Sequence, residues 1–363
     1  MSTGPLAGIR VIELGGIGPT PFACMQLADL GADVVRIDRP DDWVDERSPL
    51  RRGKRSILLD LKQPESIEVV LALVESSDVL VEGFRPGVAE RLGLGPDACI
   101  ARNERLVYGR LTGWGQTGSS IAGHDISYIA MTGALHAIGR EGQPPGVPLC
   151  LLGDLAGGAM YLVTGVLAAV IESRTSGRGQ VVDASIVDGV AALMAPIYGM
   201  AAAGQWLDER GVNELDTGRP WYDVYRTADD KWLAVGALED RFYAELLRIL
   251  GIDAVEGDRS DPAGWPALRR RIAGVIATRE RDEWAALFSR SDACVAPVLS
   301  MAEAAAAREN TRRGVFVDID GIRQPAPAPR FSRTRPSTPS APARFGDHTD
   351  EIIDELRSGR PVG

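Results

Sequence analysis

The chain has three histidines, and one of them stands in a setting that suits acid–base chemistry. His124 follows a glycine-rich stretch, residues 112–123, and Asp125 stands beside it. Imidazole is the usual general base near neutral pH, and a neighbouring carboxylate could fix its tautomer. His124 is therefore a candidate base, with a helix-capping or structural histidine as the open alternative.

A second candidate is Asp154, which follows Gly153 at the start of a long apolar stretch. Burial raises the pKa of a carboxyl group and a helix N-terminus lowers it, so the direction of the net shift stays open. We expect Asp154 at a helix N-terminus, where unpaired backbone N–H groups could stabilise a developing oxyanion. A plain N-cap is the common alternative, so the case for catalysis rests on Asp154 and His124 together.

A third feature is a concentration of cations in the first quarter of the chain. On one edge of a sheet, these side chains would form a cationic pocket for a polyanionic small ligand, such as a nucleotide with several phosphates. Interleaved acidic residues, Asp41, Asp42, Asp45 and Glu46, leave a solvated mixed-charge surface as the alternative. The cations are Arg36, Arg39, Arg47, Arg51, Arg52, Lys54, Arg55, Lys62, Arg85 and Arg91.

The glycine-rich turn at residues 15–21 disfavours nicotinamide binding. It lacks the third glycine of the GxGxxG pattern, and Pro19 and Pro21 stand where the helix should begin. The chain also has no phosphate-binding P-loop and no GxSxG nucleophile elbow.

Composition argues against several other classes. The 363 residues hold 40 basic and 50 acidic side chains, a net charge of −10, without the long basic stripe of a nucleic-acid binder. Four dispersed cysteines without a CxxC pair disfavour a zinc site or disulfide framework and favour a reducing cytoplasm. The N-terminus lacks the plan of a signal peptide. The uncharged residues 155–171 and 189–207 are expected to be buried core helices rather than membrane spans.

The first third of the chain alternates strand and helix signals. This alternation predicts an α/β domain with a mostly parallel sheet, which binds ligands at the carboxyl ends of its strands. Strands are expected at residues 11–14, 34–37, 57–59, 79–81 and 106–111, and helices at 23–30 and 66–76.

Beyond a polar junction near residues 203–220, the pattern predicts a smaller α+β unit. Six prolines in residues 325–342 predict an extended strap that returns to the first domain, before a short amphipathic helix at 350–356. The smaller unit is expected to hold a hairpin (222–226 and 231–235), helices (241–250, 265–277 and 281–289) and a strand at 295–299.

Motifs along nearly the whole chain resemble the α-methylacyl-CoA racemase branch of the family III CoA-transferase superfamily. The branch itself is indicated by residues 123–126 (GHDI) and 153–154 (GD). The wider family pattern is carried by residues 12–19 (IELGGIGP), 32–40 (ADVVRIDRP), 85–87 (RPG), 112–116 (TGWGQ), 179–183 (GQVVD) and 325–332 (PAPAPRFS).

The resemblance implies a Rossmann-like large domain that binds CoA, with a smaller α+β domain. The large domain is expected at residues 1–200, completed by 320–363, the small domain at 220–318 and a linker at 201–219. Proteins of this family form interlocked dimers, in which two subunits pass through each other as linked rings. The expected partner is therefore a second copy of the chain, with no nucleic acid and no membrane.

The resemblance also implies the site residues. The catalytic pair maps onto His124 and Asp154, and Glu239 matches an acidic residue that approaches the histidine from the partner's small domain. No cofactor is expected, because CoA is part of the substrate. CoA is expected at Ile17, Arg39, Leu59, Gly83 and Arg91.

The implied reaction inverts the α-carbon of 2-methyl-branched acyl-CoA thioesters, a step in fatty acid metabolism, through an enolate. We expect His124 to take the proton from the S substrate and Asp154 to return one on the opposite face, with the roles exchanged for R. The alternative is a family III CoA-transferase, in which Asp154 would attack the thioester and form an anhydride. That reaction needs no histidine base, so His124 favours the racemase.

The sequence departs from the branch pattern at four positions. Cys150 and Ser127 stand where the branch usually has asparagine, and the loss of two amides could alter the positioning of Asp154. Arg219 and Trp221 interrupt a Gly-Ala-Pro-Tyr stretch and could reshape the acyl pocket.

Overall fold

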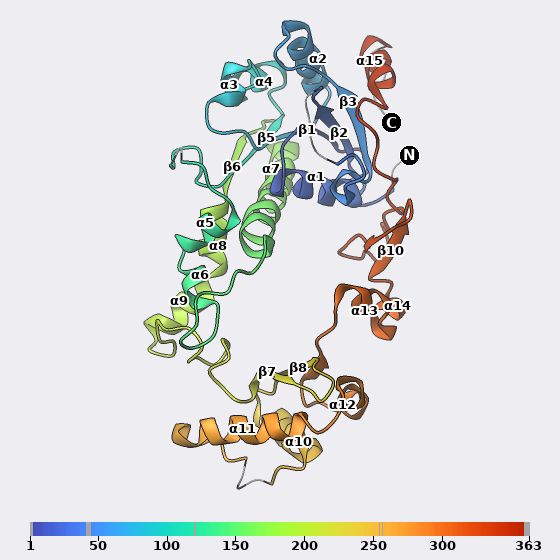
Figure 1. Cartoon of the computed structure of the whole chain (residues 1–363). Helices are drawn as coiled ribbons and strands as arrows, with labels where there is room; N and C mark the ends of the chain where they lie inside the picture. The colour runs from blue at the N-terminus through green and yellow to red at the C-terminus, as the bar shows by residue number, and fades with distance from the viewer. Residues whose placement is uncertain (1–2, 41–44, 120, 254, 256, 359–363) are drawn as a thin grey trace. The chain divides into compact units, whose positions relative to one another are not determined.

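The computed structural model describes residues 3–40, 45–119, 121–253, 255 and 257–358 (Figure 1). The chain divides into two compact units. Unit 1 consists of Met1–Thr132, Pro148–Met194 and Arg312–Gly363, and unit 2 of Gly133–Val147 and Ala195–Thr311. Unit 1 therefore uses both ends of the chain. This division assigns residues 133–147 and 201–219 to unit 2, whereas the domain limits given above stay a prediction.

Unit 1 is built on a six-stranded, entirely parallel sheet with the strand order β3-β2-β1-β4-β5-β6. The five strands expected from the sequence are present, which confirms an α/β fold with a parallel sheet. β6 was not expected; it lies at the sheet edge, where its first three residues are exposed or half-buried. The strands are β1 (Arg10–Leu14), β2 (Asp33–Asp38), β3 (Lys54–Leu58), β4 (Val79–Glu82), β5 (Val107–Thr112) and β6 (Val181–Ser185).

Helices cover both faces of this sheet. α1 (Pro19–Asp29) and α7 (Met160–Ser176) pack on one face, and α2 (Pro64–Glu75), α4 (Pro96–Arg102) and α15 (Thr349–Ser358) pack on the other (Figure 1). The apolar strands are buried on both sides, as parallel strands between helix layers are. Shorter helices of unit 1 are η1 (Pro49–Arg51), α3 (Val88–Arg91), α5 (Asp125–Ala130) and α8 (Ile186–Leu193).

The cations near β2 and β3 are neutralised inside unit 1. Arg36 pairs with Glu13 and, at 2.7 Å, with Asp38, and Arg51 contacts Asp38 at 2.6 Å. A buried charge without a partner would be strongly unfavourable, so each cation requires its carboxylate. The expected cationic pocket is therefore wrong for these side chains, which cross-link the fold. The same holds for the pairs Arg52–Asp29, Lys54–Glu13 and Arg55–Asp33.

The C-terminal part of unit 1 begins with the antiparallel hairpin β10 (Phe316–Ile319) and β11 (Ile322–Pro325). The residues after it form the expected extended strap along the sheet edge. Gly53 N–H donates to the Ser340 carbonyl at 3.1 Å, and Arg51 Nη2 donates to the Ala343 carbonyl at 3.2 Å. The expected C-terminal helix, α15, then packs beside β3 and α2.

Unit 2 contains the antiparallel sheet β7 (Tyr222–Arg226), β8 (Trp232–Gly236) and β9 (Val295–Pro297). Its apolar core includes Trp221, Tyr243 and Trp265, whose rings pack edge to face. The expected hairpin and helices are confirmed. The helices are α6 (Ala134–Ala137), α9 (Ala195–Ala202), α10 (Asp240–Leu250), η3 (Pro262–Gly264), α11 (Trp265–Ile276), α12 (Arg281–Phe288) and α13 (Met301–Ala306), while α14 (Arg308–Arg313) crosses the boundary between the units.

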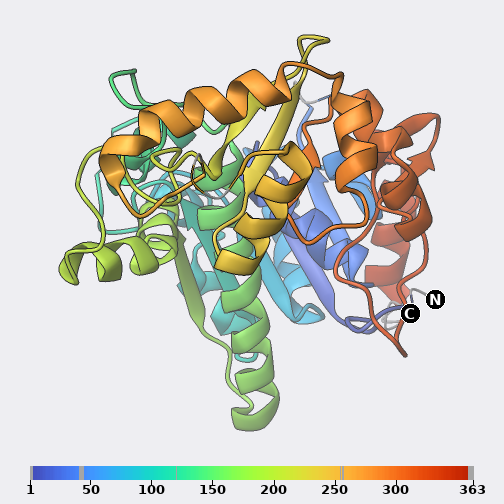
Figure 2. The same ribbon diagram turned by 90° about the horizontal axis from the view of Figure 1, so that it is seen from below.

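Leu151–Ser176 is the one helical segment of the described residues with the length and apolar composition of a membrane span. Its second part, α7, is the long green rod of Figure 2 and packs on β5 and β6 through buried residues that include Leu162 and Val166. These contacts agree with the expected core helix. The uncharged residues 189–207 are instead divided between α8 and α9, and α9 has no buried residue, so the expected core helix is wrong there.

Candidate active site

Asp154 lies in a stretch of π-helix, η2 (Leu151–Ala159), that continues directly into α7. The Leu155 N–H donates to the carbonyl of Cys150, five residues earlier, at 3.2 Å. Asp154 is the fourth residue of η2 and lies in its first turn, so it is near a helix N-terminus as expected, but the helix begins three residues earlier. Its N–H donates to Asp125 Oδ2 at 2.7 Å, so this N–H is already used and does not serve as an oxyanion donor. Such π-helical stretches are rare and often mark functional sites.

Glycines allow η2 to approach its neighbour α8 closely. A Cβ atom at Gly157 would lie 2.5 Å from Val190 Cγ2, and one at Gly189 would lie 1.8 Å from the Gly157 carbonyl oxygen. A side chain at either position would push the two helices apart. The unusual helix that carries Asp154 therefore depends on glycine in two separate segments.

A pocket of about 610 Å³ opens at the carboxyl ends of β1, β4 and β5, where a parallel sheet is expected to bind ligands. Its volume lies within the usual range for small-molecule sites. Five of the residues predicted from the sequence line it together: Ile17, Gly83, Arg91, His124 and Asp154. Arg85, one of the cations expected at a ligand pocket, also lines it, as do Trp114 and Tyr128, to which the sequence gave no site role.

The other three predicted site residues are not among the lining residues of this pocket. Arg39 follows β2, and its Nε is buried with no hydrogen-bond partner in the described part of the chain. Leu59 follows β3, is half-buried against the core, and donates its N–H to the Asp38 carbonyl at 2.9 Å. Glu239 is an exposed residue of unit 2, at the N-cap of α10. The roles expected for all three stay predictions.

Hydrogen bonds hold the loop that carries His124. His124 is the N-cap of α5, and its N–H donates to Ser127 Oγ at 3.5 Å. Ser127, which stands where the branch usually has asparagine, therefore holds the histidine backbone. The Tyr128 hydroxyl donates to the Gly123 carbonyl at 2.6 Å. The Tyr128 ring also packs edge to face on Trp114, with 4.9 Å between the ring centres. The glycine-rich loop is thus fixed immediately before His124.

The surroundings of Asp154 make it suitable for proton transfer. Burial and the nearby charge of Asp125 raise the pKa of Asp154 to about 6, although His124 opposes this shift. Burial therefore outweighs any effect of a helix N-terminus on the pKa of Asp154, and the net shift, which stayed open in the sequence, is upward. A carboxyl group that titrates near neutral pH can both take up and release a proton at working pH.

Asp125 does not serve His124 in the way the sequence suggested. Its carboxylate accepts the N–H of Asp154 instead of fixing the tautomer of the neighbouring histidine. The reason is the start of α5, which leaves His124 exposed and buries Asp125 against Gly153. The four-residue spacing of His124 and Tyr128 was the one signal in the sequence that could have linked Tyr128 to the site.

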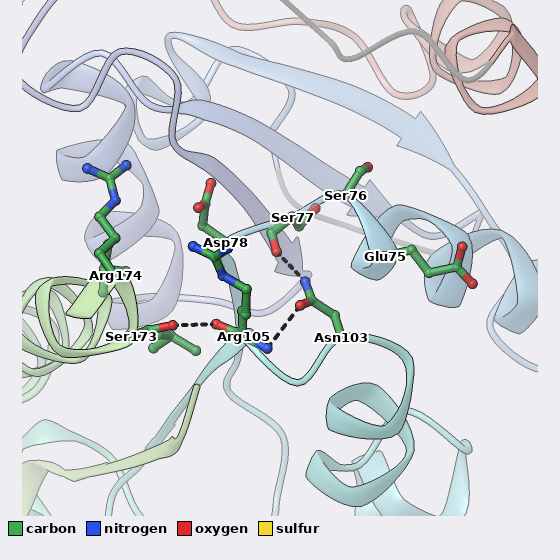
Figure 3. Close-up of a pocket in the computed structure, with 10 residues that line it drawn as sticks. Glu75, Ser76, Ser77, Asp78, Asn103, Arg105, Ser173 and Arg174 are labelled. Carbon is green, nitrogen blue, oxygen red and sulfur yellow. Dashed lines mark hydrogen bonds between the residues drawn. The ribbon is translucent and has the colours of Figure 1, made fainter. Parts of the chain in front are cut away.

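A second hollow, of about 240 Å³, lies at the opposite, amino end of the sheet, and polar groups in its wall are hydrogen-bonded to one another. Asn103 Nδ2 donates to the Ser77 carbonyl at 2.8 Å, and Asn103 Oδ1 accepts the Arg105 N–H at 3.0 Å (Figure 3). Ser173 Oγ donates to the Arg105 carbonyl at 2.9 Å. These bonds join α2, α4, β5 and α7 and give the hollow a structural role.

Of the two departures in unit 2, Trp221 belongs to the apolar core, and the partly exposed Arg219 packs against an aromatic ring beside it. Trp221 is 5% exposed and packs among aromatic rings, and the Arg219 guanidinium lies 4.1 Å from the ring centre of Trp265. Both side chains therefore stabilise unit 2 itself.

The family model for CoA-transferase family III matches residues 6–349, and the chain belongs to this family. The chain is 44% identical to the α-methylacyl-CoA racemase of Mus musculus over 96% of its own length and 93% of that protein. It is also 44% identical to the α-methylacyl-CoA racemase of Homo sapiens, over 98% and 94% of the two chains. The crystal structure of a CAIB/BAIF family protein from Brucella suis matches with a TM-score of 0.85 and 25% identity, over 98% of this chain and all of that one.

Proposed function

We propose that the chain is an α-methylacyl-CoA racemase, which inverts the α-carbon of 2-methylacyl-CoA thioesters by 1,1-proton transfer through an enolate. The observation that carries the proposal is the placement of His124 and Asp154 along one pocket, with the pKa of Asp154 raised to about 6 by burial and by Asp125. The 44% identity to two mammalian racemases over nearly the full length supports the same reaction.

Inversion requires one acid–base group on each face of the α-carbon. With the S substrate, neutral His124 takes the α-proton while Asp154, in its protonated form, supplies a proton to the opposite face. The enzyme then holds a protonated His124 and an ionised Asp154, the state that accepts the R substrate. The two forms contain the same number of protons, so the reaction runs in both directions without proton gain or loss by the pair.

The pocket also suits the CoA part of the substrate. Arg85 and Arg91 line it and supply positive charge for phosphate groups. Gly83 forms part of its wall, and a Cβ atom there would lie 2.4 Å from Thr20 Oγ1. The proposal places Arg39 and Leu59 farther along the CoA molecule, beyond the ends of β2 and β3. CoA enters and leaves with the substrate, so no separate cofactor is proposed.

The proposal includes a homodimer in which Glu239 of a second copy approaches His124. Large apolar side chains exposed on α5, η2 and α8 of unit 1 support it, because such surfaces are commonly covered by a partner. They include Ile126, Leu151 and Leu193. Cytoplasmic location, and the lack of nucleic-acid and membrane partners, remain predictions from composition.

The test is incubation with each enantiomer of a 2-methylacyl-CoA in heavy water. Both should epimerise and incorporate deuterium at the α-carbon without any acceptor acid. An active enzyme that gives no deuterium exchange would contradict the enolate route. Transfer of CoA to an added carboxylic acid, without epimerisation, would instead support the CoA-transferase reaction through an anhydride at Asp154.

A further inference from the structure

Asp125 is a buried carboxylate that the proposed reaction does not yet use. It is only 7% exposed, and its two oxygens are in different situations. Oδ2 accepts the N–H of Asp154 at 2.7 Å, whereas Oδ1 is buried and has no hydrogen-bond partner in the described part of the chain. A buried polar atom without a partner is unfavourable for stability, so a fold that keeps one has a reason outside stability.

The first reason concerns the backbone of η2. The first N–H groups of any helix lack partners within it, and Cys150 at the N-cap makes no capping hydrogen bond through its side chain. Asp125 supplies an acceptor from a different helix, α5, directly to the N–H of Asp154. Gly153 makes this approach possible, because a Cβ atom there would lie 2.5 Å from Asp125 Oδ2. The start of η2 is therefore fixed through the carboxylate of Asp125.

The second reason concerns charge. The two aspartates are in direct contact, and Asp125 acts on the carboxyl group of Asp154 in the same direction as burial does. The other groups near Asp154 are His124 and Tyr128, from the N-cap and body of α5, and Arg85 and Arg91, which line the same pocket. Among these, Asp125 is the group whose negative charge favours the protonated form of Asp154.

We propose that Asp125 is a positioning residue for Asp154: it fixes the Asp154 backbone in the π-helical turn and places a second negative charge behind its carboxyl group. This inference rests on the proposed racemase function. The charge matters because the S direction begins with protonated Asp154 and neutral His124, and the R direction begins with the opposite arrangement. Two bases can serve both directions well when their proton affinities are similar, and an ordinary surface aspartate is too acidic beside a histidine.

The central experiment compares D125N with the wild-type chain. Asparagine keeps an oxygen that can accept the Asp154 N–H, but it removes the charge. We expect the midpoint of the Asp154 titration, followed by carbon NMR of the labelled carboxyl group and assigned with D154N, to move down by about one pH unit. The matching limb of the kcat profile should move with it, and kcat should fall by up to about tenfold in both directions, because the equilibrium between the R and S substrates is fixed and one pKa unit represents a tenfold change. KM should stay within about twofold.

Two further variants separate backbone from charge. D125A removes both the acceptor and the charge, so kcat should fall further than in D125N. G153A keeps the carboxylate but displaces it, and should also lower the titration midpoint of Asp154. The matched control is D97N, which removes an exposed first-turn carboxylate from α4 and should leave the Asp154 titration and both rates unchanged.

An unchanged titration of Asp154 in D125N would overturn the inference, and so would equal kcat values in D125N and D125A. The NMR titration needs no substrate, so it tests Asp125 even in a chain without racemase activity. If the wild-type chain fails to epimerise, the proposed function is wrong while the titration still decides the effect of Asp125 on Asp154. If the wild-type chain epimerises and the titration does not move, only the inference about Asp125 is wrong.

Discussion

Polar groups gather at both ends of the six-stranded sheet of unit 1, but their hydrogen bonding differs. At the amino end, the amide of Asn103 and the hydroxyl of Ser173 are hydrogen-bonded to neighbouring backbone groups (Figure 3). At the carboxyl end, Asp125 Oδ1 is buried without a partner among the described residues, and the pKa of Asp154 is raised by burial and by Asp125. At the amino end, complete hydrogen bonding stabilises the fold. At the carboxyl end, a buried carboxylate oxygen stays without a partner in the described part of the chain and a neighbouring carboxyl group has a raised pKa, which suits proton transfer to a substrate.

The largest expected effect comes from removing either base at the carboxyl end. In D154N, His124 can still exchange the α-proton of the S substrate with heavy water, but no group returns a proton on the opposite face. H124Q should show the reverse, with exchange of the R substrate alone. Epimerisation should fall by about 10²- to 10⁴-fold in both variants, the usual contribution of a positioned acid or base. Chiral analysis together with deuterium counting measures both quantities, and epimerisation near the wild-type rate in either variant would remove that residue from the mechanism.

A second comparison sets one arginine from each end of the sheet against the other. Arg91 lines the carboxyl-end pocket and Arg105 lines the amino-end hollow. R91A should raise the Kd for CoA by about 10- to 100-fold, since a hydrogen bond to a charged group contributes about 1.5–3 kcal/mol. R105A is the control and should leave the Kd unchanged. Calorimetric titration with CoA compares the two variants. Equal losses of affinity would mean that CoA does not bind specifically at the carboxyl-end pocket.

Much of the fold was predictable because the sheet of unit 1 has strong local signals. The apolar runs of β1, β2 and β4 are bounded by turns, and each is buried on both faces, so length and composition alone identify them. The neutralised cations were not predictable in the same way. Glu13 and Arg36 are 23 residues apart and meet because β1 and β2 pair in a register that places them opposite each other. Sequence order does not contain that register.

The site was predictable in its residue types and only partly in its geometry. His124 stood out as one of three histidines and because it follows a glycine-rich stretch, and Asp154 stood out because it stands at the start of a long apolar stretch. The π-helix around Asp154 was missed, because it depends on contact between Gly157 and Gly189, which lie on separate helices. Asp125 was expected to act on His124 and instead contacts Asp154, because the side chains of neighbouring residues point in different directions at the start of a helix. These features arise from tertiary packing rather than from local sequence.

A smaller effect should follow from breaking the network at the amino end. Asn103 Nδ2 donates to the carbonyls of Val74 and Ser77, so N103A leaves two backbone acceptors without this partner. The free energy of unfolding in urea should fall by about 1–3 kcal/mol. Because this network lies away from the pocket, kcat and KM should stay within about twofold of wild type. A loss of activity larger than the loss of stability would mean that the two ends of the sheet are coupled.

The smallest expected effect has the opposite sign and concerns D154N. Burial and Asp125 raise the pKa of Asp154 from the ordinary 3.8 to about 6, so the folded chain binds this proton more tightly than the unfolded chain does. Stability is therefore lost as pH rises between these two values, and the loss remains at neutral pH. Each pKa unit corresponds to about 1.4 kcal/mol, and the partial exposure of Asp154 reduces the total to the order of 1–2 kcal/mol.

D154N cannot ionise, so it should unfold at higher urea concentration than wild type at about pH 7 and at a similar concentration at about pH 4. D97N provides the control, because its exposed carboxyl group has no comparable burial. A variant that loses catalysis and gains stability would show that the ionisable group at the carboxyl end is kept for chemistry. A D154N chain less stable than wild type at neutral pH would instead mean that this carboxylate stabilises the fold, as the polar groups at the amino end do.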